Sequence, residues 1–562
     1  MYPHGGIKNM IDNLETLFKF VGGLGMFLYG MNVMADGLQK SAGNKMKSLL
    51  GYLTNNRLLA VIFGALITAI IQSSSATTVM VVGFVNAGLM NLVQAVGVIM
   101  GANIGTTITS WLVSMNEWSA ALKPEFFAPL LIGIGAFAIM FTKREKMKEV
   151  GEILVGFGVL FIGLSFMSGA IKPYASSPIF TKAFTLLGGN PVLGILTGAV
   201  VTAIIQSSSA SVGILQTLAA NGIVTWNSAV YITLGQNIGT CVTALISSAG
   251  ANKTAKRAAV IHLLFNTIGA IIFGAIMFFL FATNKSFATA NINSVQISIF
   301  HTIFNVTCTI LLFPFAKLLV KLSGVFIKDE NDSVTEYKGE VHETLKHLDN
   351  RILETPSFAV ESAIKEVIHM GYIALDNAKA SVDALLTKNE ALIHQVLQNE
   401  EVIDEQSKLI TEYLIKISNL SLTEKQHFVV NNLFYTVSNI ERVGDHAENL
   451  AELAQHRIDH NVDFTEEAYA ELKEISDTAL KAFEYSVKAR ETENIEFVRN
   501  VVKYEDIVDT LEEEFREKHI ERLSKNNCNT EAGIIFVDTL VNLERMSDHS
   551  LNIAGYVKDE ME

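Results

Sequence analysis

The chain has 562 residues, 49% of them hydrophobic, and a formal net charge of −14. Residues 1–327 hold 19 Lys and Arg against 8 Asp and Glu, whereas residues 328–562 hold 24 against 49. A basic, apolar part followed by an acidic part predicts a membrane domain in a lipid bilayer and then a soluble domain. Three widely spaced cysteines exclude a disulfide framework, and we expect no nucleic acid partner for so acidic a chain.

Apolar stretches recur through the first part, and a spanning helix needs about 20 apolar residues. Two stretches are interrupted near the middle by the polar runs Gln72–Ser75 and Gln206–Ser209. Their arms of about 14 residues are too short to cross the ~30 Å hydrocarbon core, so each predicts a re-entrant helical hairpin with its tip in mid-membrane. The stretches lie at about 18–39, 58–88, 91–114, 125–142, 150–171, 191–248, 258–282 and 296–320.

The two hairpins belong to an internal repeat. Residues 64–76 read GALITAIIQSSSA and residues 198–210 read GAVVTAIIQSSSA. The strings GANIGT at 101–106 and GQNIGT at 235–240 are displaced by the same 134 residues as the first pair. A constant displacement indicates a duplication. We therefore predict repeat 1 at about 18–142, repeat 2 at about 150–282 and a final helix at 296–320.

Basic residues orient the repeats, because short cytoplasmic loops are enriched in Lys and Arg. The basic loops lie near 40–57, 143–148 and 253–257. If these are cytoplasmic, repeat 1 crosses the membrane three times and the second copy is inserted upside down. Inverted repeats with broken helices at the centre are typical of secondary transporters. The prediction is a polytopic all-α membrane domain, with about seven crossings and two polar tips that meet near the midplane.

The tips carry no ionisable side chain, since residues 58–114 and 191–248 contain no Asp, Glu, Lys or Arg. A half-helix that starts at a tip offers free N–H groups and a positive dipole end, which suit an oxyanion. Hydroxyl and amide groups add donors at the same point. The predicted substrate-binding residues are Gln72, Ser73, Ser74, Ser75, Gln206, Ser207, Ser208 and Ser209.

A cation site is expected beside the tips. Breaks at Gly101–Gly105 and Gly235–Gly239 should release backbone carbonyls, and neighbouring amide and hydroxyl oxygens suit a hard monovalent cation. A bound cation would also offset part of the cost of burying an anion. The predicted sodium-binding residues are Asn103, Thr106, Asn237 and Thr240.

The paired QSSS motifs, each followed by a G-x-N-I-G-T string, resemble the type II sodium/phosphate cotransporters over residues 15–325. The resemblance implies sodium-dependent symport of inorganic phosphate, with sodium as the coupling ion and both ligands held at the hairpin tips and adjoining helices. Family members that move net charge carry an Asp beside a His in the first repeat, and residues 126–141 here contain neither. An electroneutral cycle with fewer sodium ions is therefore expected.

The acidic part is helix-patterned and contains its own repeat. Glu441-Arg-Val-Gly-Asp445-His matches Glu544-Arg-Met-Ser-Asp548-His after a displacement of 103 residues. Residues at i and i+4 share one helix face, and facing carboxylate stripes are how helical bundles build metal sites. The predicted divalent-metal ligands are Glu400, Asp404, Glu441, Asp445, Glu505, Asp509, Glu544 and Asp548.

These strings resemble the PhoU family of phosphate-regulatory proteins. That resemblance implies a soluble α-helical bundle of two three-helix halves, a regulatory role, and magnesium, zinc, iron or manganese as the metal. The predicted domains are a transmembrane domain at 1–327, a linker at 328–339 and a cytoplasmic PhoU-like domain at 340–562. The sequence is compatible with a homodimer and with a regulatory partner that binds the tail.

The predicted function is sodium-coupled phosphate symport across a bacterial plasma membrane. One alternative is a sodium-coupled carrier for another small anion, such as sulfate or a dicarboxylate, because half-helix tips alone do not specify a tetrahedral ligand. A second is a membrane-anchored regulator that senses phosphate without transporting it. An enzyme is not expected, since no nucleophile and base pair or phosphate-binding loop is present.

Overall fold

The computed structural model describes residues 4–50, 56–118, 123–174, 177–328, 348–525 and 529–562. The chain forms two compact units. Among the described residues, the membrane unit comprises the chain through residue 328 together with Asp349–Phe358, and the tail unit is essentially Ala359–Glu562. The described residues are almost entirely helical, and their one β-type pairing is an isolated bridge between Thr225 and Asn291.

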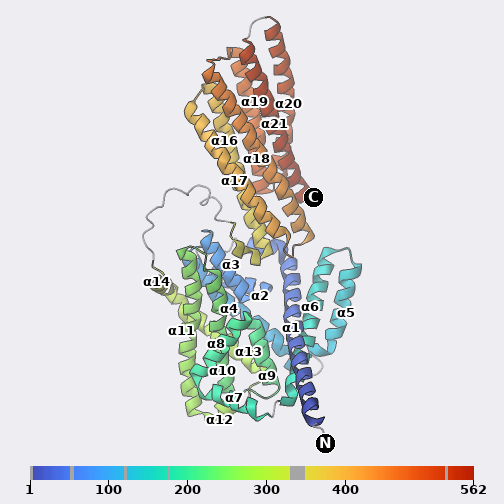
Figure 1. Cartoon of the computed structure of the whole chain (residues 1–562), viewed down its shortest axis with the longest axis vertical. Coiled ribbons are helices and arrows are strands. Elements are labelled where there is room, and N and C mark those ends of the chain that lie inside the picture. Colours follow the sequence, from blue (N-terminus) through green and yellow to red (C-terminus); the bar gives the residue numbers. More distant parts are fainter. Residues whose placement is uncertain (1–3, 51–55, 119–122, 175–176, 329–347, 526–528) are drawn as a thin grey trace. The chain divides into compact units, whose positions relative to one another are not determined.

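The membrane unit contains the predicted repeats in chain order (Figure 1). The first repeat is formed by α1 (His4–Leu50), α2 (Arg57–Ile71), α3 (Ser74–Asn86), α4 (Leu92–Ser114) and α5 (Pro124–Phe141). The second is formed by α6 (Glu145–Ile171), α7 (Pro178–Gly189), α8 (Pro191–Ile205), α9 (Ser208–Ala220), α10 (Trp226–Ser247) and α11 (Lys253–Thr283). The unit ends with α12 (Lys285–Thr289), α13 (Ser294–Leu312) and α14 (Ala316–Phe326).

Seven helical segments of the described residues are long and apolar enough to cross a membrane. They correspond to α1, α4 and α5 in the first repeat, α6, α10 and α11 in the second, and the combined α13 and α14. The predicted count of about seven is confirmed. The sequence missed α7, which is bent by 112° from α8 and extends the second hairpin at its base.

The two predicted re-entrant hairpins are present. Hairpin 1 consists of α2 and α3, with 15 and 13 residues, and hairpin 2 of α8 and α9, with the same two lengths. At 1.5 Å per residue, each arm reaches about 20 Å, well short of a bilayer core. Figure 1 shows α3 toward one end of the membrane unit and α9 toward the other. In addition, α3 packs on α10 and α11 of the second repeat, while α9 packs on α4 of the first.

The predicted breaks at Gly101–Gly105 and Gly235–Gly239 are wrong, because α4 and α10 are continuous through both strings. The glycines serve close helix packing instead. A Cβ at Gly101 would lie 2.0 Å from the carbonyl oxygen of Val61 on α2, and one at Gly235 would lie 1.9 Å from that of Ile195 on α8. Small residues that let backbones approach in this way are common at membrane helix contacts.

Within its described residues, the tail unit is a bundle of six helices, as predicted. They are α16 (Pro356–Thr387), α17 (Glu390–Ser418), α18 (Glu424–Asp459), α19 (Glu466–Thr492), α20 (Ile495–Ser524) and α21 (Thr530–Met561). Each half places three long helices in sequence, and α18 of the first half packs on α21 of the second. Apolar residues at helical spacing fill the interior of the bundle, among them the buried Ala359, Phe483 and Phe536.

Most of the predicted linker, residues 328–339, and the start of the predicted tail domain lie outside the described residues, so these boundaries stay predictions. The described chain resumes at residue 348 and forms a short 3-10 helix, η5 (Asn350–Glu354), before α16 begins. This segment packs within the membrane unit.

Candidate functional site

The two hairpin tips have the same backbone conformation. Gln72 ends α2 with φ 57° and ψ 20°, and Gln206 ends α8 with φ 55° and ψ 22°. Both are left-handed conformations, which non-glycine residues rarely adopt outside functional or capping positions. The next residue caps the second arm: the hydroxyl of Ser73 accepts from the N–H of Ala76 at 3.1 Å, and that of Ser207 from Ala210 at 3.2 Å.

The first N–H groups of α3 and α9 have no acceptor in their own helix, as at the start of any helix. Each cap satisfies one of these groups and leaves the others open. The first turns also carry the positive ends of the helix dipoles. Each tip is therefore an anion-binding element built from neutral groups.

Both tips line one cavity of about 270 Å³. The structure thus brings together seven of the eight predicted substrate residues, from two segments 134 positions apart. Ser74 is the exception: it is buried but does not line the cavity. The lining comprises Gln72, Ser73, Ser75, Gln206, Ser207, Ser208 and Ser209, with Ile71 and residues of α1.

Helix α1 forms the remaining wall with Leu28, Met31, Asn32 and Ala35. Asn32 is the polar member of this set, and the sequence did not single it out. A lone Asn in an apolar helix has no repeated partner and no motif around it, so no signal in the sequence distinguishes it from a polar residue that packs between helices.

Hydroxyl groups hold the arms of each hairpin together. The Oγ1 of Thr68 on α2 donates to Oγ1 of Thr77 on α3 at 3.0 Å, and Thr202 on α8 donates to Oγ of Ser211 on α9 at 2.8 Å. Thr109 on α4 also donates to Oε1 of Gln72 at 3.0 Å. These bonds hold the two arms together near each tip. None of them uses the hydroxyl of a serine that lines the cavity.

The four predicted sodium residues do not line the cavity. Each donates to a carbonyl one turn earlier in its own continuous helix: Asn103 to Ile99, Thr106 to Ala102, Asn237 to Thr233 and Thr240 to Gln236. Such back-bonding is the ordinary way in which an amide or hydroxyl is satisfied inside a membrane helix. All four side chains are nevertheless buried beside the hairpins.

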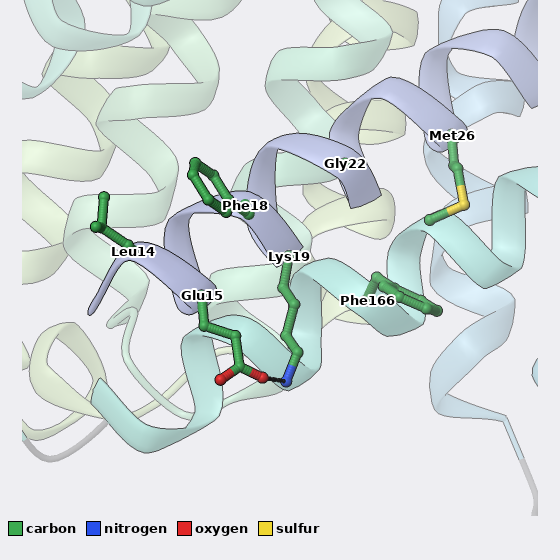
Figure 2. A pocket seen from close by; sticks show the side chains of 7 residues that line it. All are labelled: Leu14, Glu15, Phe18, Lys19, Gly22, Met26 and Phe166. Atoms are coloured by element: carbon green, nitrogen blue, oxygen red, sulfur yellow. Dashed lines mark ion pairs between the residues drawn. The ribbon is translucent and has the colours of Figure 1, made fainter. Parts of the chain in front are cut away.

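Another hollow in the membrane unit has a different character. Figure 2 shows its lining side chains on the first half of α1, with Phe166 of α6 beside them. Its volume is about 580 Å³. Its charged residues, Glu15 and Lys19, form an ion pair of 2.6 Å on a single helix turn. The other lining residues are Leu14, Phe18, Gly22, Met26 and Phe166. A charge pair that is already neutralised, in an apolar groove, offers no site for a small oxyanion.

In the tail unit, Glu400 is the most unusual predicted metal ligand. Its side chain is only 6% exposed, and neither carboxylate oxygen has a hydrogen-bond partner among the described residues. A Cβ at Gly444 on α18 would lie 2.5 Å from Oε2, so the glycine makes room for the carboxylate. Burial, reinforced by Asp445 and Asp404, raises the pKa of Glu400 to about 8.

The second carboxylate cluster repeats these residues 103 to 105 positions later. One oxygen each from Glu505, Asp509 and Asp548 lies within 4.8 Å of the others. Burial and the nearby acidic groups, Asp509 first, raise the pKa of Glu505 to about 7. Burial also raises the pKa values of Glu441 and Glu544, one helical turn before Asp445 and Asp548.

The predicted ligands thus influence one another in two acidic clusters, and among the described residues Glu505, Asp509 and Asp548 are those close enough to share one ion. Hard oxygen ligands at that spacing fit a divalent cation. The unpaired oxygens of Glu400 need a proton or a cation, because an isolated buried carboxylate is strongly disfavoured. A further group that the sequence did not indicate, His456, His460 and Glu531, also lies within 4.8 Å.

Among the described residues, two repeats of three candidate spans each, one further span, and two short hairpins whose tips line a polar cavity define a secondary transporter. The family model described as Na+/Pi-cotransporter matches residues 26–169 and 172–304, and the PhoU domain model matches residues 367–454 and 472–557. The chain belongs to the Na+/Pi-cotransporter family and carries a PhoU domain in its tail unit.

Three relatives illustrate the match. YjbB of Salmonella typhimurium, whose name proposes inorganic phosphate export, is 24% identical over 552 residues, 97% of this chain and 98% of that protein. YqeW of Bacillus subtilis, named as uncharacterized, is 30% identical over 311 residues, 55% of this chain and 98% of that protein. Human sodium-dependent phosphate transport protein 2B is 30% identical over 115 residues, 20% of this chain and 17% of that protein.

Proposed function

We propose that this protein couples the entry of sodium to the uptake of inorganic phosphate across a bacterial plasma membrane. The observation that carries the proposal is the cavity of about 270 Å³ between the two QSSS tips. Its lining residues, as described, include the N-termini of two helices, five serines and two glutamines, and none of them is charged. A donor-rich, neutral site of this kind binds an oxyanion through backbone dipoles and hydroxyls.

Membership of the Na+/Pi-cotransporter family supports phosphate over the alternative anions and sodium as the coupling ion. We still propose four buried residues as the sodium ligands: Asn103, Thr106, Asn237 and Thr240. They lie in the same strings as Gly101 and Gly235, where α4 packs closely on α2 and α10 packs closely on α8. In this proposal, sodium binding requires a local rotation of these side chains away from their own helix carbonyls.

The direction of transport is the main alternative, because YjbB carries the name of a phosphate exporter over nearly the whole of this chain. A symporter driven inward by sodium and an exporter can share one site, since alternating access works in both directions and the gradients decide. We favour uptake because an inward sodium gradient is the ordinary driving force for symport.

The test is transport of radiolabelled phosphate in proteoliposomes that contain the full chain. We expect uptake when sodium is present outside only, and at most background uptake with potassium instead. Phosphate efflux from preloaded vesicles that is independent of sodium would overturn symport and support the exporter. Transport of sulfate or a dicarboxylate without phosphate would identify another anion, and no transport of any of them would favour a sensor.

The sodium ligands are tested separately. Replacement of Asn103 or Asn237 by Ala should raise the sodium concentration for half-maximal uptake about tenfold, as expected for the loss of one ligand. The KM for phosphate at saturating sodium should stay close to that of the unmodified protein. An unchanged sodium dependence in both variants would remove these residues from the proposal.

We also propose that the PhoU domain lies in the cytoplasm and binds divalent metal ions at its two acidic clusters. Asp349, which precedes the tail, accepts a hydrogen bond from Asn86 on α3. Asn86 in turn accepts from the N–H of Asn252, which caps α11 directly before the basic residues 253–257 that we predict to be cytoplasmic. For the metal, the buried and unpaired oxygens of Glu400 are the supporting observation. The domain would regulate transport in response to phosphate.

A further inference from the structure

A short stretch of chain from beyond the membrane helices is inserted into hairpin 1. We call Asp349–Phe358 the docking segment; it comprises η5 and the first turn of α16. It follows 19 residues that lie outside the described structure, and it packs in the membrane unit. Ile352, Thr355 and Phe358 are each at most 1% exposed, so the contact is a buried one.

Aromatic rings place Phe358 against both arms of hairpin 1. Its ring centroid lies 6.4 Å from that of Phe63 on α2 and 5.7 Å from that of Phe84 on α3, the latter edge-on. These separations are typical of favourable aromatic pairs. The two arms meet at the tip near Gln72 and Ser73, and Phe63 and Phe84 lie well away from it along their helices, so Phe358 contacts the hairpin at a distance from the tip.

Polar contacts hold the docking segment on α3. Asp349 Oδ2 accepts from the side-chain amide of Asn86 at 2.7 Å and from Arg351 Nη1 at 2.6 Å. Arg351 Nε donates to the backbone carbonyl of Ser247 at the end of α10, at 2.7 Å. A cation at the last carbonyls of a helix is favoured by the helix dipole. The segment therefore joins α3 of the first repeat to α10 of the second.

Backbone proximity shows how close this contact is. A Cβ at Gly83 on α3 would lie 3.0 Å from Cβ of Arg351 and 3.2 Å from Cγ1 of Ile352. Hairpin 2 lacks the aromatic pair, because the positions equivalent to Phe63 and Phe84 are Thr197 and Leu218. The attachment is thus specific to hairpin 1, and the duplication of the membrane repeats does not explain it.

From these contacts we propose that the docking segment is a positioning element for phosphate binding: it fixes the angle between the arms of hairpin 1 and so holds the tip serines in place. The proposal rests on the proposed transport function. Helix α3 is continuous over 13 residues, from Ser74 at the tip to Asn86 at the contact. Because α16 continues from Phe358 into the tail unit, the PhoU domain is covalently joined to this positioning element.

The test compares full-chain variants in proteoliposomes, with phosphate uptake and hydrogen exchange as readouts. For Arg351→Ala we expect the KM for phosphate to rise about three- to tenfold, as for one or two lost hydrogen bonds, with Vmax per folded transporter within about twofold. Amides at Gly83–Asn86 should exchange faster. Arg499→Ala, on an exposed residue of α20, is the matched control and should match the unmodified protein.

A second variant reaches the same contact by different chemistry. Gly83→Leu keeps every polar partner but pushes Ile352 and Arg351 away from α3, so it should raise the KM in the same direction. A purely structural role would instead lower the yield or Vmax and leave the KM unchanged, and that result in both variants would overturn the proposal. Faster exchange at Gly83–Asn86 can be measured without transport, so a failed transport assay of the unmodified protein overturns only the proposed function.

The covalent link to the PhoU domain has its own variant. Four glycine and serine residues inserted after Glu361 interrupt α16 and leave Phe358 in its first turn. If the PhoU domain helps to hold the docking segment, the KM for phosphate should rise as in Arg351→Ala. An unchanged KM and unchanged exchange at Gly83–Asn86 would show that the segment positions hairpin 1 alone, and would overturn this part of the proposal.

Discussion

At the scale of single residues, the three serines of each tip have different tasks. Ser73 and Ser207 cap the second arms and also line the cavity, as do Ser75, Ser208 and Ser209, whereas Ser74 is buried and does not line it. Replacement of Ser75 or Ser209 by Ala should raise the KM for phosphate about 10- to 100-fold, because a hydrogen bond to a charged group contributes about 1.5–3 kcal/mol. Concentration-dependent phosphate uptake measures the effect.

Ser74→Ala is the matched control for Ser75→Ala, since it also removes one serine hydroxyl from the first turn of α3 but leaves the cavity lining unchanged. Its KM should stay within about threefold of the unmodified protein, the range of a weak indirect effect. A larger loss in Ser74→Ala than in Ser75→Ala would show that the anion binds in a different place from the cavity described.

Asn32 gives a second prediction, because it places a neutral amide on the α1 wall of the anion cavity. Asn32→Asp would put a negative charge beside the bound phosphate in a site that contains no cationic side chain to offset it. Two negative charges that face each other across one small, low-dielectric cavity repel strongly. We expect uptake to fall at least tenfold, whereas Asn32→Ala should keep a measurable fraction. Equal activity of the two variants would place Asn32 outside the site.

At the scale of elements, the glycines of the G-x-N-I-G-T strings are packing residues. Gly101→Ala should force α4 away from α2, since the added methyl group would overlap the carbonyl of Val61. Overpacking of this kind typically destabilises by about 1–3 kcal/mol. The expected result is a lower melting temperature and yield in detergent, with the sodium dependence of the surviving transporter unchanged. Gly133→Ala on α5 is the control, because its Cβ would have no neighbour within 4 Å.

These helices also show what the sequence could and could not predict. An apolar stretch that is too short to cross the membrane twice, with four polar residues in its middle, is most simply explained by a re-entrant hairpin. The runs Gln72–Ser75 and Gln206–Ser209 therefore identified both tips. Glycine at Gly101 and Gly105, in contrast, is compatible with either a broken helix or a close helix contact, and only the position of α2 distinguishes them. The docking segment could not be foreseen, because Arg351 and Phe358 carry no motif and contact residues far away in sequence.

The first acidic cluster of the tail predicts a dependence of stability on pH. The pKa of Glu400 is raised from 4.5 to about 8. Between these values the folded state binds more protons than the unfolded state, so stability falls as pH rises through that window. Glu400→Gln should flatten this part of the pH profile in calorimetry of the full chain. A profile that keeps its slope in the variant would assign it to other groups.

Manganese should act in the opposite sense on the same cluster, since metal ions bind the ionised carboxylates and displace the proton. A ligand that binds only the folded state stabilises it by mass action. The rise in melting temperature on adding manganese should therefore be larger near pH 8 than near pH 6, and should shrink in Glu400→Gln. Equal stabilisation at both pH values would indicate that the metal binds elsewhere.

At the scale of the whole molecule, the distribution of charge limits how transport responds to voltage. Residues 58–114 and 191–248 contain no ionisable carboxylate, residues 126–141 contain neither Asp nor His, and the lining residues of the cavity carry only neutral oxygens. With few cation sites, the simplest cycle moves a divalent phosphate with two sodium ions and no net charge. The membrane potential would then do no work on the cycle.

This gives a prediction for phosphate accumulation in vesicles whose potential is set by a potassium gradient and an ionophore. Movement of one net charge would change the driving force by about 2.3 kcal/mol per 100 mV, or roughly forty- to fiftyfold in the accumulation ratio. We expect accumulation to follow the sodium gradient and to change less than about twofold with potential. A strong increase with inside-negative potential would require a further sodium ion in each cycle, and therefore a cation site outside the two repeats' hairpins and α5.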